Sequence, residues 1–403
     1  MATTAHDMDS VSGLLEELKV FDDDLELNEQ NRLQMLQVAR ALVRALETPQ
    51  ETVLRLCWAE PTLYGAIIMA IDTGLFRHMN RCPDLPMTAR NLSEFTGVDP
   101  TLLKRGRIMK HLAAMGVIHE YGPDEYLPNK LSRTLSLEKY ADGFPCMANG
   151  AMRAIYKLPE YFKKVGYVNP NDPTDGPFQY AYNTSKHWFV WSTQYPSLFR
   201  QFNNHMSAYH QGRPSWMDAD FFPVHSVLTA GARRDADSVF LVDVGGGLGH
   251  DLMEFSQKHP STPGRLILQD KRDVIAQIQG GLGEIEAMAH NFFTKQPIQG
   301  ARAYYLHSVL HDWPDNECIR ILSCIAGSME PGYSKLLINE NIVPDQGADW
   351  QITGLDLMLM TLVSARERRE GEWRQLLAQA GFQIVHIWTY SAGVESLIEC
   401  ELV

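Results

Sequence analysis

The chain has 403 residues, of which 45% are hydrophobic and 21% charged, a balance typical of globular proteins and too apolar for a disordered chain. Its 36 lysines and arginines stand against 49 aspartates and glutamates, which gives a formal net charge of −13. That charge disfavours nucleic acid and anionic membrane surfaces as partners. The length is sufficient for two or three domains, each with its own core.

The cysteines and the first residues bear on the cell compartment. The six cysteines are scattered without a CxxC pair, so neither a disulfide framework nor a zinc ribbon is expected. The opening MATTAHDMDSV has no basic segment followed by an apolar core, so no secretory signal is expected. No apolar run approaches the ~20 residues of a membrane span. We therefore expect a cytoplasmic protein that uses no membrane.

The N-terminal third, from Val11 to about Arg133, has a helical pattern. One apolar stripe recurs at helical spacing until Pro49 ends it. Its members are Leu33, Leu36, Ala39, Val43 and Leu46. The next segment, Leu63–Met79, is apolar on most sides and is expected to be buried.

A compact motif follows. Thr88 is a good N-cap for a short helix that Gly97 can end, and Asp99 with Pro100 can start another helix, which Gly116 ends. The segment VIHEYGPDEYLP then predicts a hairpin with its turn at Gly122–Pro123. This order of helices and hairpin predicts a winged helix-turn-helix.

Two interpretations of that motif are open. The basic residues Lys104, Arg105, Arg107 and Lys110 lie on one predicted helix, as DNA recognition requires. The alternative is a packing module whose basic face is solvated. We favour the second, because the whole chain is strongly acidic.

The second half has a different pattern. After a loop at 169–177 and a helical, aromatic-rich stretch at 189–222, short β-branched runs alternate with helical segments: VFLVDV, RLILQ, EIEAMA, AYYL and KLLINE. Such alternation predicts a parallel sheet with helices on both faces. FQIVHIW and ESLIECELV are separated only by a short turn, so they are expected to form an antiparallel edge.

A glycine loop joins the first of these strands to a helix. VFLVDV runs into Gly245–Gly249, and a strand, glycine turn and helix N-terminus bring backbone N–H groups close to a ligand. A dinucleotide fingerprint would need glycine where His250 stands, so NAD fits poorly. Asp243 precedes the loop, and Asp270 closes the next strand, where an acid can bind ribose hydroxyls.

The loop, Asp270 and the segment His290–Phe292 suit an adenosine without pyrophosphate. Asn291 and Phe292 can offer an amide and an aromatic face to an adenine. His311 lies just past the strand AYYL, and ligands of open α/β sheets sit at the carboxyl ends of strands. A histidine there can accept a proton near neutrality.

The motifs DVGGGLG, LILQD, HSVLHDWPDNEC, LLINENIVPD and ARERREGEWRQLLAQAGF, in this order, resemble the class I S-adenosylmethionine-dependent O-methyltransferases of the caffeate and polyketide type. The similarity extends over nearly the whole chain and is greatest to fungal secondary-metabolism members. It implies a Rossmann-like catalytic domain at 186–403 with a C-terminal antiparallel edge. It also implies an all-helical winged-helix dimerisation domain at 1–185.

The resemblance implies roles for particular residues. His311 would be the general base, with Glu340 and Glu367 flanking it to fix its tautomer and stabilise the imidazolium. Asp312 has two interpretations, a direct role or an N-cap for the helix beginning at Pro314. No metal ion is expected.

The same resemblance places the ligands. S-adenosylmethionine, leaving as S-adenosylhomocysteine, would contact Asp243, Gly245, Gly247, Asp270, Asn291, Phe292 and His307. Substrate walls would come from Phe202, Met206, Tyr209, Met358 and Leu359, although each could equally be ordinary core. A homodimer would bury the Leu33–Leu46 stripe.

The expected activity is therefore methyl transfer from S-adenosylmethionine to an aromatic or enolic hydroxyl of a small natural product. One alternative comes from fungal proteins of this fold that bind the same cofactor and catalyse dehydration and pericyclic ring closure without methyl transfer. In those proteins the base position tends to carry lysine or arginine, whereas here it is His311. A DNA-binding regulator is the third interpretation.

Overall fold

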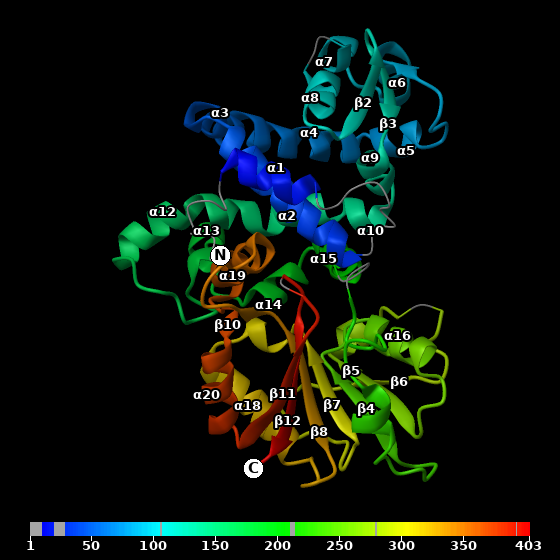
Figure 1. Cartoon of the computed structure of the whole chain (residues 1–403), viewed down its shortest axis with the longest axis vertical. Coiled ribbons are helices and arrows are strands. Elements are labelled where there is room, and N and C mark those ends of the chain that lie inside the picture. The colour runs from blue at the N-terminus through cyan, green and yellow to red at the C-terminus, as the bar shows by residue number, and fades with distance from the viewer. Residues whose placement is uncertain (1–9, 20–28, 105–106, 210–213, 279, 392) are drawn as a thin grey trace. The chain divides into compact units, whose positions relative to one another are not determined.

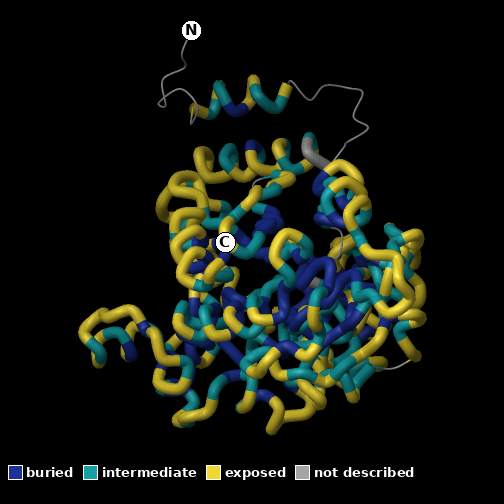
Figure 2. The backbone as a smooth tube through the Cα atoms, turned by 90° about the horizontal axis from the view of Figure 1, so that it is seen from below, coloured by how far each residue is buried: buried dark blue, intermediate teal, exposed yellow. Residues whose placement is uncertain are grey.

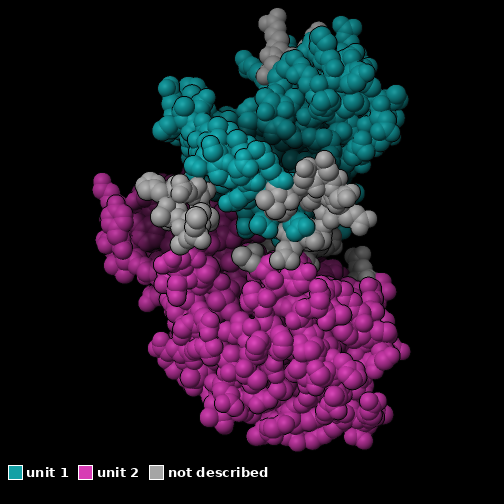
Figure 3. Space-filling model, viewed as in Figure 1, with its two compact units in different colours: residues 1–144 teal, residues 145–403 magenta. Residues whose placement is uncertain are grey.

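The computed structural model describes residues 10–19, 29–104, 107–209, 214–278, 280–391 and 393–403. It divides into two compact units, Met1–Phe144 and Pro145–Val403, coloured separately in Figure 3. Residues 145–185, which the sequence analysis assigned to the N-terminal domain, belong to the second unit. The reason is packing, because Ala154, Phe178 and Ala181 share a buried apolar cluster with Leu359 and Val363.

The first unit is helical apart from one small sheet (Figure 1). In chain order it contains α1 (Val11–Lys19), α2 (Glu29–Leu46), α3 (Pro49–Leu54), the π-helical turn Arg55–Ala59, α4 (Glu60–Asp72), α5 (Leu75–Met79), β1 (Met87–Thr88), α6 (Ala89–Thr96), α7 (Pro100–Lys104), α8 (Ile108–Ala114), β2 (Ile118–Gly122), β3 (Glu125–Pro128), α9 (Lys130–Thr134) and α10 (Glu138–Ala141). The sheet has the order β1-β3-β2 and its pairs are antiparallel.

The predicted caps around α6 are confirmed. The side chain of Thr88 accepts a hydrogen bond from the N–H of Asn91, and Gly97 ends the helix in the left-handed conformation. The predicted hairpin is also present, but its turn falls at Pro123–Asp124, one residue later than expected, because β2 continues through Gly122. Asp124 takes a positive φ of 61° there.

The apolar segment Leu63–Met79 is divided between α4 and α5 by Gly74, whose φ is 70°. Its burial is one-sided: Ile67 and Phe76 are buried, whereas Met69 is 40% exposed. Within the described residues one continuous helix, Pro49–Asp72, is long and apolar enough to cross a membrane by length and composition, with 17% of its apolar window buried. The expectation that no run reaches such a length is therefore wrong.

The basic residues of the DNA-binding interpretation do not lie on one helix as predicted, because Lys104 ends α7, whereas Arg107 is the N-cap of α8 and Lys110 lies within α8. The side chain of Lys104 and the whole of Arg105 lie outside the described residues. Lys110 forms an ion pair with Glu120 of β2, so its charge is partnered within the unit.

The second unit holds the large sheet. Its elements are α11 (Gly143–Met147) at the unit boundary, the π-helical turn Ala148–Met152, α12 (Arg153–Val165), α13 (Pro177–Tyr182), α14 (Trp188–Ser192), α15 (Pro196–Tyr209), the π-helical turn His225–Thr229, β4 (Val239–Val244), α16 (His250–Lys258), β5 (Arg265–Asp270), α17 (Arg272–Ile275), β6 (Glu286–Ala289), β7 (Ala303–His307), the 3-10 turn Leu310–Asp312, α18 (Asp315–Ala326), β8 (Lys335–Glu340), β9 (Ile342–Val343), α19 (Trp350–Val363), β10 (Arg368–Arg369), α20 (Glu370–Gln379), β11 (Phe382–Thr389) and β12 (Ser396–Leu402).

The seven-stranded sheet has the order β11-β12-β8-β7-β4-β5-β6. The five strands from β8 to β6 are parallel, and β11 and β12 pair antiparallel at one edge. Both the parallel sheet and its antiparallel edge confirm the sequence prediction. The parallel arrangement brings the carboxyl ends of β4, β5, β7 and β8 to one edge, where ligands of such sheets bind.

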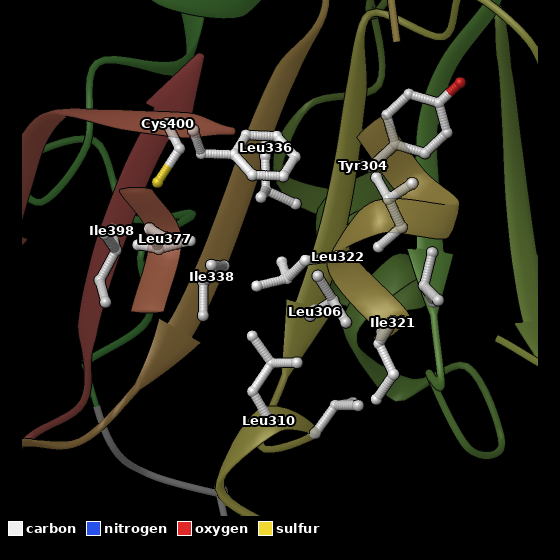
Figure 4. Packing of buried hydrophobic residues seen from close by; sticks show 14 of the residues in the cluster. Tyr304, Leu306, Leu310, Ile321, Leu322, Leu336, Ile338, Leu377, Ile398 and Cys400 are labelled. Atoms are coloured by element: carbon white, nitrogen blue, oxygen red, sulfur yellow. The ribbon is translucent and has the colours of Figure 1, made fainter. Parts of the chain in front are cut away.

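Each face of the sheet is covered by helices, because successive strand residues point to opposite sides. Leu336 and Ile338 pack against α18 and α20 in one buried cluster, whereas Leu337 between them joins Trp216 and Phe255 in another. Figure 4 shows part of the first cluster around Leu322. In Figure 2 the buried residues, in dark blue, gather in the interior, and the exposed ones, in yellow, follow the outside.

Candidate active site

The glycine loop follows β4 and leads directly into α16. Gly245, Gly247 and Gly249 all have positive φ, between 60° and 84°, a region that favours glycine. A Cβ on Gly245 would lie 2.9 Å from Cγ2 of Val309, and one on Gly246 would lie 2.2 Å from Oδ2 of Asp243. The loop therefore packs so tightly that side chains are excluded on its inner side.

Asp270 ends β5 and holds the loop in place. Its Oδ2 accepts the N–H of Gly247 at 2.8 Å, and its Oδ1 accepts the N–H of Lys271 at 2.6 Å. Each carboxylate oxygen has two lone pairs, so acceptor capacity remains for ribose hydroxyls. Burial raises the pKa of Asp270 above its ordinary value.

Asp243 lies beneath the loop. Its side chain is 0% exposed and neither carboxylate oxygen has a hydrogen-bond partner in the described structure. Burial, and then the neighbouring Asp251 carboxylate, raise the pKa of Asp243 well above its ordinary value. The side-chain oxygen of Ser308, directly after β7, is also buried without a hydrogen-bond partner, and Ser308 has a strained φ of 51°. Such unsatisfied oxygens fit a polar, cationic ligand group.

His307 is enclosed by two acids. Its Nδ1 lies 2.6 Å from Oδ2 of Asp251, and its Nε2 lies 3.3 Å from Oε2 of Glu395. Burial by itself lowers the pKa of His307, but the two carboxylates outweigh it and raise that pKa well above the ordinary value. Both ring nitrogens are thus engaged with protein groups, and the imidazolium ties β7 to α16 and β12.

The aromatic residues beyond β6 form one side of the loop region. Phe292 lies near Gly245, and Trp313 meets Phe292 and Phe293 edge-on at centroid distances of 6.0 and 4.8 Å. The ring of His187 stacks on Trp313 at 4.9 Å. Asn291 is exposed, and its side-chain oxygen accepts the N–H of Phe293 at 3.1 Å.

The 3-10 turn Leu310–Asp312 carries His311 at the carboxyl edge of the sheet. Oε1 of Glu340, the last residue of β8, accepts the backbone N–H groups of Val309, Leu310 and His311 at 3.1, 2.9 and 3.3 Å. One carboxylate oxygen therefore fixes the backbone of the whole turn. Its other oxygen, Oε2, lies 3.3 Å from Nδ1 of His311.

A second acid meets the same imidazole nitrogen. Oε1 of Glu367 lies 3.1 Å from Nδ1 of His311. All three side chains are buried, with His311 6%, Glu340 0% and Glu367 4% exposed. The predicted catalytic residues are thus brought together, although they lie on three separate elements. Nδ1 faces the carboxylates, which leaves Nε2 to meet a reacting group.

Known proteins with the same features identify the family. A family model described as an O-methyltransferase domain matches residues 177–383. The chain is 36% identical to the O-methyltransferase mpaG of Penicillium roqueforti. The matched region of 396 residues covers 98% of this chain and 99% of that protein. The chain belongs to the O-methyltransferase family.

Two solved structures share the fold. A pericyclic reaction enzyme superposes with a TM-score of 0.87 and 28% identity over 98% of both chains. OxaC, in complex with S-adenosylhomocysteine and oxaline, superposes with a TM-score of 0.84 and 25% identity over 99% of this chain and 98% of that one. This O-methyltransferase transfers a methyl group to an oxygen atom of a natural product, and S-adenosylmethionine is its methyl donor.

In this O-methyltransferase, burial strengthens the electrostatic interactions between His311 and the carboxylates around it. Burial by itself lowers the pKa of His311, but Glu340, Glu367 and Asp312 outweigh it and raise that pKa to about 10. Burial raises the pKa of Glu340 to about 7, against the opposing effect of His311. The cluster therefore stabilises an imidazolium.

Asp312 is not the N-cap of the following helix, because α18 begins at Asp315 with Pro314 in the cap position. Its Oδ1 instead lies 3.8 Å from Nε2 of His311, beyond hydrogen-bond distance. Burial raises the pKa of Asp312 to about 6. Of its two interpretations, the capping one is wrong.

His311, Glu340 and Glu367 are also the described residues whose ligand atoms, within 4.8 Å of one another, could hold a metal ion. Oε1 of Glu340 accepts three backbone N–H groups, and Oε1 of Glu367 is bonded to His311 and to the amide of Asn341, whereas Oε2 of each acid has no hydrogen-bond partner in the described structure. That donor set suits a hydrogen-bonded acid–base cluster. Metal-free catalysis stays a prediction.

The predicted substrate walls are placed less uniformly. Phe202 of α15 meets Trp188 and Phe189 edge-on at 4.8 and 6.0 Å. Leu359 is 6% exposed inside an apolar cluster, which is the ordinary core arrangement. Met206 is 36% exposed, and Met358 is partly buried. The side chain of Tyr209 lies outside the described residues.

A hollow of about 840 Å³ is lined by Trp313, by the loop at 169–174 and by residues of the segment 364–368. His187 and Asp315 contribute to its lining, whereas His311, Glu340 and Glu367 do not. It therefore opens beside the catalytic turn without reaching its acids.

Sequence reasoning missed several residues of the site. Asp251 and Glu395 enclose His307, and Asn341 donates to Glu367. Arg368 is 0% exposed, and its guanidinium donates to Asp315 and to the carbonyls of Leu310 and Trp313. Only Arg368 and Asn341 had a sequence signal, since each adjoins a predicted catalytic acid.

Proposed function

We propose that this O-methyltransferase methylates a phenolic or enolic hydroxyl of a small aromatic or polyketide-like molecule, with His311 accepting the hydroxyl proton. The observation that carries the proposal is the engagement of Nδ1 of His311 by Glu367 and Glu340, at 3.1 and 3.3 Å. Because both acids face Nδ1, the neutral imidazole carries its proton there and presents a lone pair on Nε2.

Each residue of the cluster then has a separate role in the reaction. Bound S-adenosylmethionine supplies an electrophilic methyl group. His311 would take the proton of the acceptor hydroxyl on Nε2, which would make the hydroxyl oxygen a better nucleophile toward that methyl group. Glu367 and Glu340 stabilise the imidazolium that results, and Glu340 holds the turn in place through its backbone hydrogen bonds.

The proton affinities match this assignment. The pKa of His311 is raised to about 10, and a phenol has an ordinary pKa of about 10. The raised proton affinity of His311 supports a phenolic or enolic hydroxyl as the proton donor, since an alkyl alcohol is far less acidic. This match favours acidic hydroxyls as substrates.

We propose that the cofactor lies along the glycine loop. Gly245 and Gly247 would offer close approach to the backbone, Asp270 would accept ribose hydroxyls, and Phe292 with Asn291 would border the adenine. Asp243 and His307 would support the cofactor site from beneath the glycine loop, since Asp243 is buried and His307 is held by Asp251.

Phe202, Met206, Tyr209, Met358 and Leu359 remain our proposed substrate walls. Phe202 has the strongest support, because it belongs to an edge-to-face group of aromatic rings that suits a planar ligand. Leu359 would contribute through the backing of that wall, since its own side chain is packed in the core.

A homodimer through the first unit is supported by exposed apolar side chains. Val43 and Leu46 of α2 are 53% and 61% exposed, and Val53, Leu56 and Trp58 of the next helix are 56%, 52% and 68% exposed. Val43 and Leu46 belong to the predicted Leu33–Leu46 stripe, of which Leu33, Leu36 and Ala39 are less exposed. Exposed apolar side chains are costly in water, and a second copy of the chain would bury them.

We propose that the elements from α6 to β3 form a winged-helix module that serves as a scaffold and binds no nucleic acid, which the charge of −13 supports. A cytoplasmic location with no membrane partner rests on composition alone.

The alternative is a pericyclic or dehydration reaction without methyl transfer, which the 0.87 TM-score to a pericyclic reaction enzyme favours. Retention of His311 with both acids supports methyl transfer instead. The two are separated by incubating the enzyme with labelled S-adenosylmethionine and a panel of phenols and enols. Methyl transfer requires one equivalent of S-adenosylhomocysteine per product, whereas a rearranged product without it would establish the alternative.

A further inference from the structure

A small parallel strand pair connects two of the site's segments. β9 and β10 pair in parallel, with Ile342 opposite Arg368 and Val343 opposite Arg369. The residues that precede each strand, Asn341 and Glu367, are brought side by side by that register. The segment after β8 and the segment before α20 therefore meet at Glu367.

Asn341 contacts Glu367 directly. Its Nδ2 donates to Oε1 of Glu367 at 3.0 Å, and the same oxygen lies 3.1 Å from Nδ1 of His311. Asn341 is 2% exposed, and the Glu367 side chain is fully buried, so neither group has water to replace this bond.

The two acids of the cluster receive different donors. Oε1 of Glu340 accepts three backbone N–H groups, a set that no side-chain substitution removes. Oε1 of Glu367 accepts only side-chain donors in the described structure, from His311 and Asn341. The orientation of Glu367 therefore depends on Asn341.

We propose that Asn341 is a positioning residue that holds the Glu367 side chain against Nδ1 of His311. The proposal rests on the proposed function, in which His311 is the base. An amide N–H can only donate, so Asn341 fixes Oε1 of Glu367 as the acceptor in this contact.

The groups that face Glu367 give the sign of the effect. His311 and Asp312 face it from the 3-10 turn, Glu340 from β8, and Asp356 of α19 accepts its backbone N–H at 2.8 Å. Arg368 follows it but directs its guanidinium to Asp315 and backbone carbonyls. Without the Asn341 donor, this acid-rich cluster would bind its proton more tightly. The acid limb of the kcat–pH profile would then move to higher pH.

The test compares Asn341→Leu with Asn341→Asp in the full-length enzyme, with methyl transfer to a verified acceptor as the assay. Asn341→Leu removes the donor, and we expect kcat to fall about ten- to hundred-fold with KM for both substrates nearly unchanged. Its acid limb should move up by about one pH unit. Asn341→Asp keeps the shape but replaces the donor by an acceptor, so its shift should be at least as large.

Gln296→Met is the matched control, since Gln296 is a buried amide that pairs with Gln269 in the same unit. It should lower the unfolding temperature without moving the acid limb. S-adenosylhomocysteine affinity and the unfolding temperature show whether each Asn341 variant is folded, and the same-shaped Asn341→Asp carries the test if Asn341→Leu is not.

An unshifted acid limb in the folded Asn341 variants, or an Asn341→Asp enzyme that resembles wild type while Asn341→Leu does not, would overturn the proposal in favour of simple packing. The proposed function fails separately, if His311→Ala keeps wild-type turnover. A large loss in His311→Ala with unshifted Asn341 variants would contradict the positioning role alone.

Discussion

Nδ1 of His311 lies 3.1 Å from Oε1 of Glu367, although 56 residues separate them in the chain. The contact forms because the 3-10 turn after β7 and the segment before α20 both end at the carboxyl edge of the sheet. In the proposed reaction, this contact leaves Nε2 of His311 to meet the acceptor hydroxyl. The reaction assigned to this O-methyltransferase depends on that orientation.

Replacing Glu367 by glutamine should separate charge from shape. Glu367→Gln removes a negative charge beside the imidazolium, so the pKa of His311 should fall and the acid limb of kcat should move to lower pH. We expect kcat to drop about ten- to hundred-fold. Steady-state kinetics across pH measure both effects, and a shift to higher pH would be incompatible with this charge assignment.

The wild-type profile should rise well above neutrality. The pKa of His311 is raised to about 10, so the imidazole is protonated near pH 7. A complex in which the acceptor hydroxyl is also protonated then carries one proton more than the reactive state, in which the imidazole is neutral. That proton leaves as the pH rises, and kcat should therefore increase between about pH 7 and 9. A profile that is flat over this range in a saturating assay would contradict the raised proton affinity.

The glycine loop should tolerate no side chain at Gly246. A Cβ there would lie 2.2 Å from Oδ2 of Asp243 and 2.6 Å from Cδ1 of Leu268. Gly246→Ala should lower the free energy of unfolding by about 1–3 kcal/mol and weaken S-adenosylhomocysteine binding in calorimetry. Gly354→Ala is the control, since a Cβ at this helical glycine meets nothing within 4 Å, and it should stabilise by up to ~1 kcal/mol.

Disrupting the exposed stripe should produce monomers. Leu46→Glu places a charge on a side chain that is 61% exposed in the single chain, which an interface would have to desolvate. Light scattering after size exclusion should show about half the wild-type mass. As the control, Val403→Glu changes a residue that is 88% exposed and should leave the mass unchanged. If the Leu46→Glu variant were still a dimer, the stripe would not belong to the interface.

Chelation should not affect turnover. His311, Glu340 and Glu367 are within metal-binding range of one another, but their hydrogen bonds describe an acid–base cluster. Prolonged dialysis against EDTA is expected to leave kcat unchanged. Loss of activity that Zn²⁺ or Mg²⁺ restores would assign a metal to these residues instead.

Regular patterns made most of the second unit predictable. The β-branched runs gave the strands, and the short gap between FQIVHIW and ESLIECELV gave the antiparallel edge. The position of Asp270 after the glycine loop predicted a binding role, and its carboxylate does hold Gly247. Each of these signals is local in the chain.

The features that escaped the sequence depend on contacts between distant segments. The domain boundary moved because α12 and α13 pack on α19, which no local pattern shows. Asp251 and Glu395 could not be linked to His307 without the fold, since they lie 56 and 88 residues away. Asn341 adjoins Glu340 in sequence but serves Glu367, because the β9–β10 register decides its partner.

The most direct test of the account is single-turnover methyl transfer by His311→Ala with the cofactor and a verified phenolic or enolic acceptor bound. Loss of the base should lower the rate at pH 7.5 by about 10²–10⁴-fold, with S-adenosylhomocysteine affinity preserved. The residual rate should rise with pH as the acceptor ionises by itself. A His311→Ala enzyme that stays within a few-fold of the wild-type rate at pH 7.5 would contradict the assignment of His311 as the base.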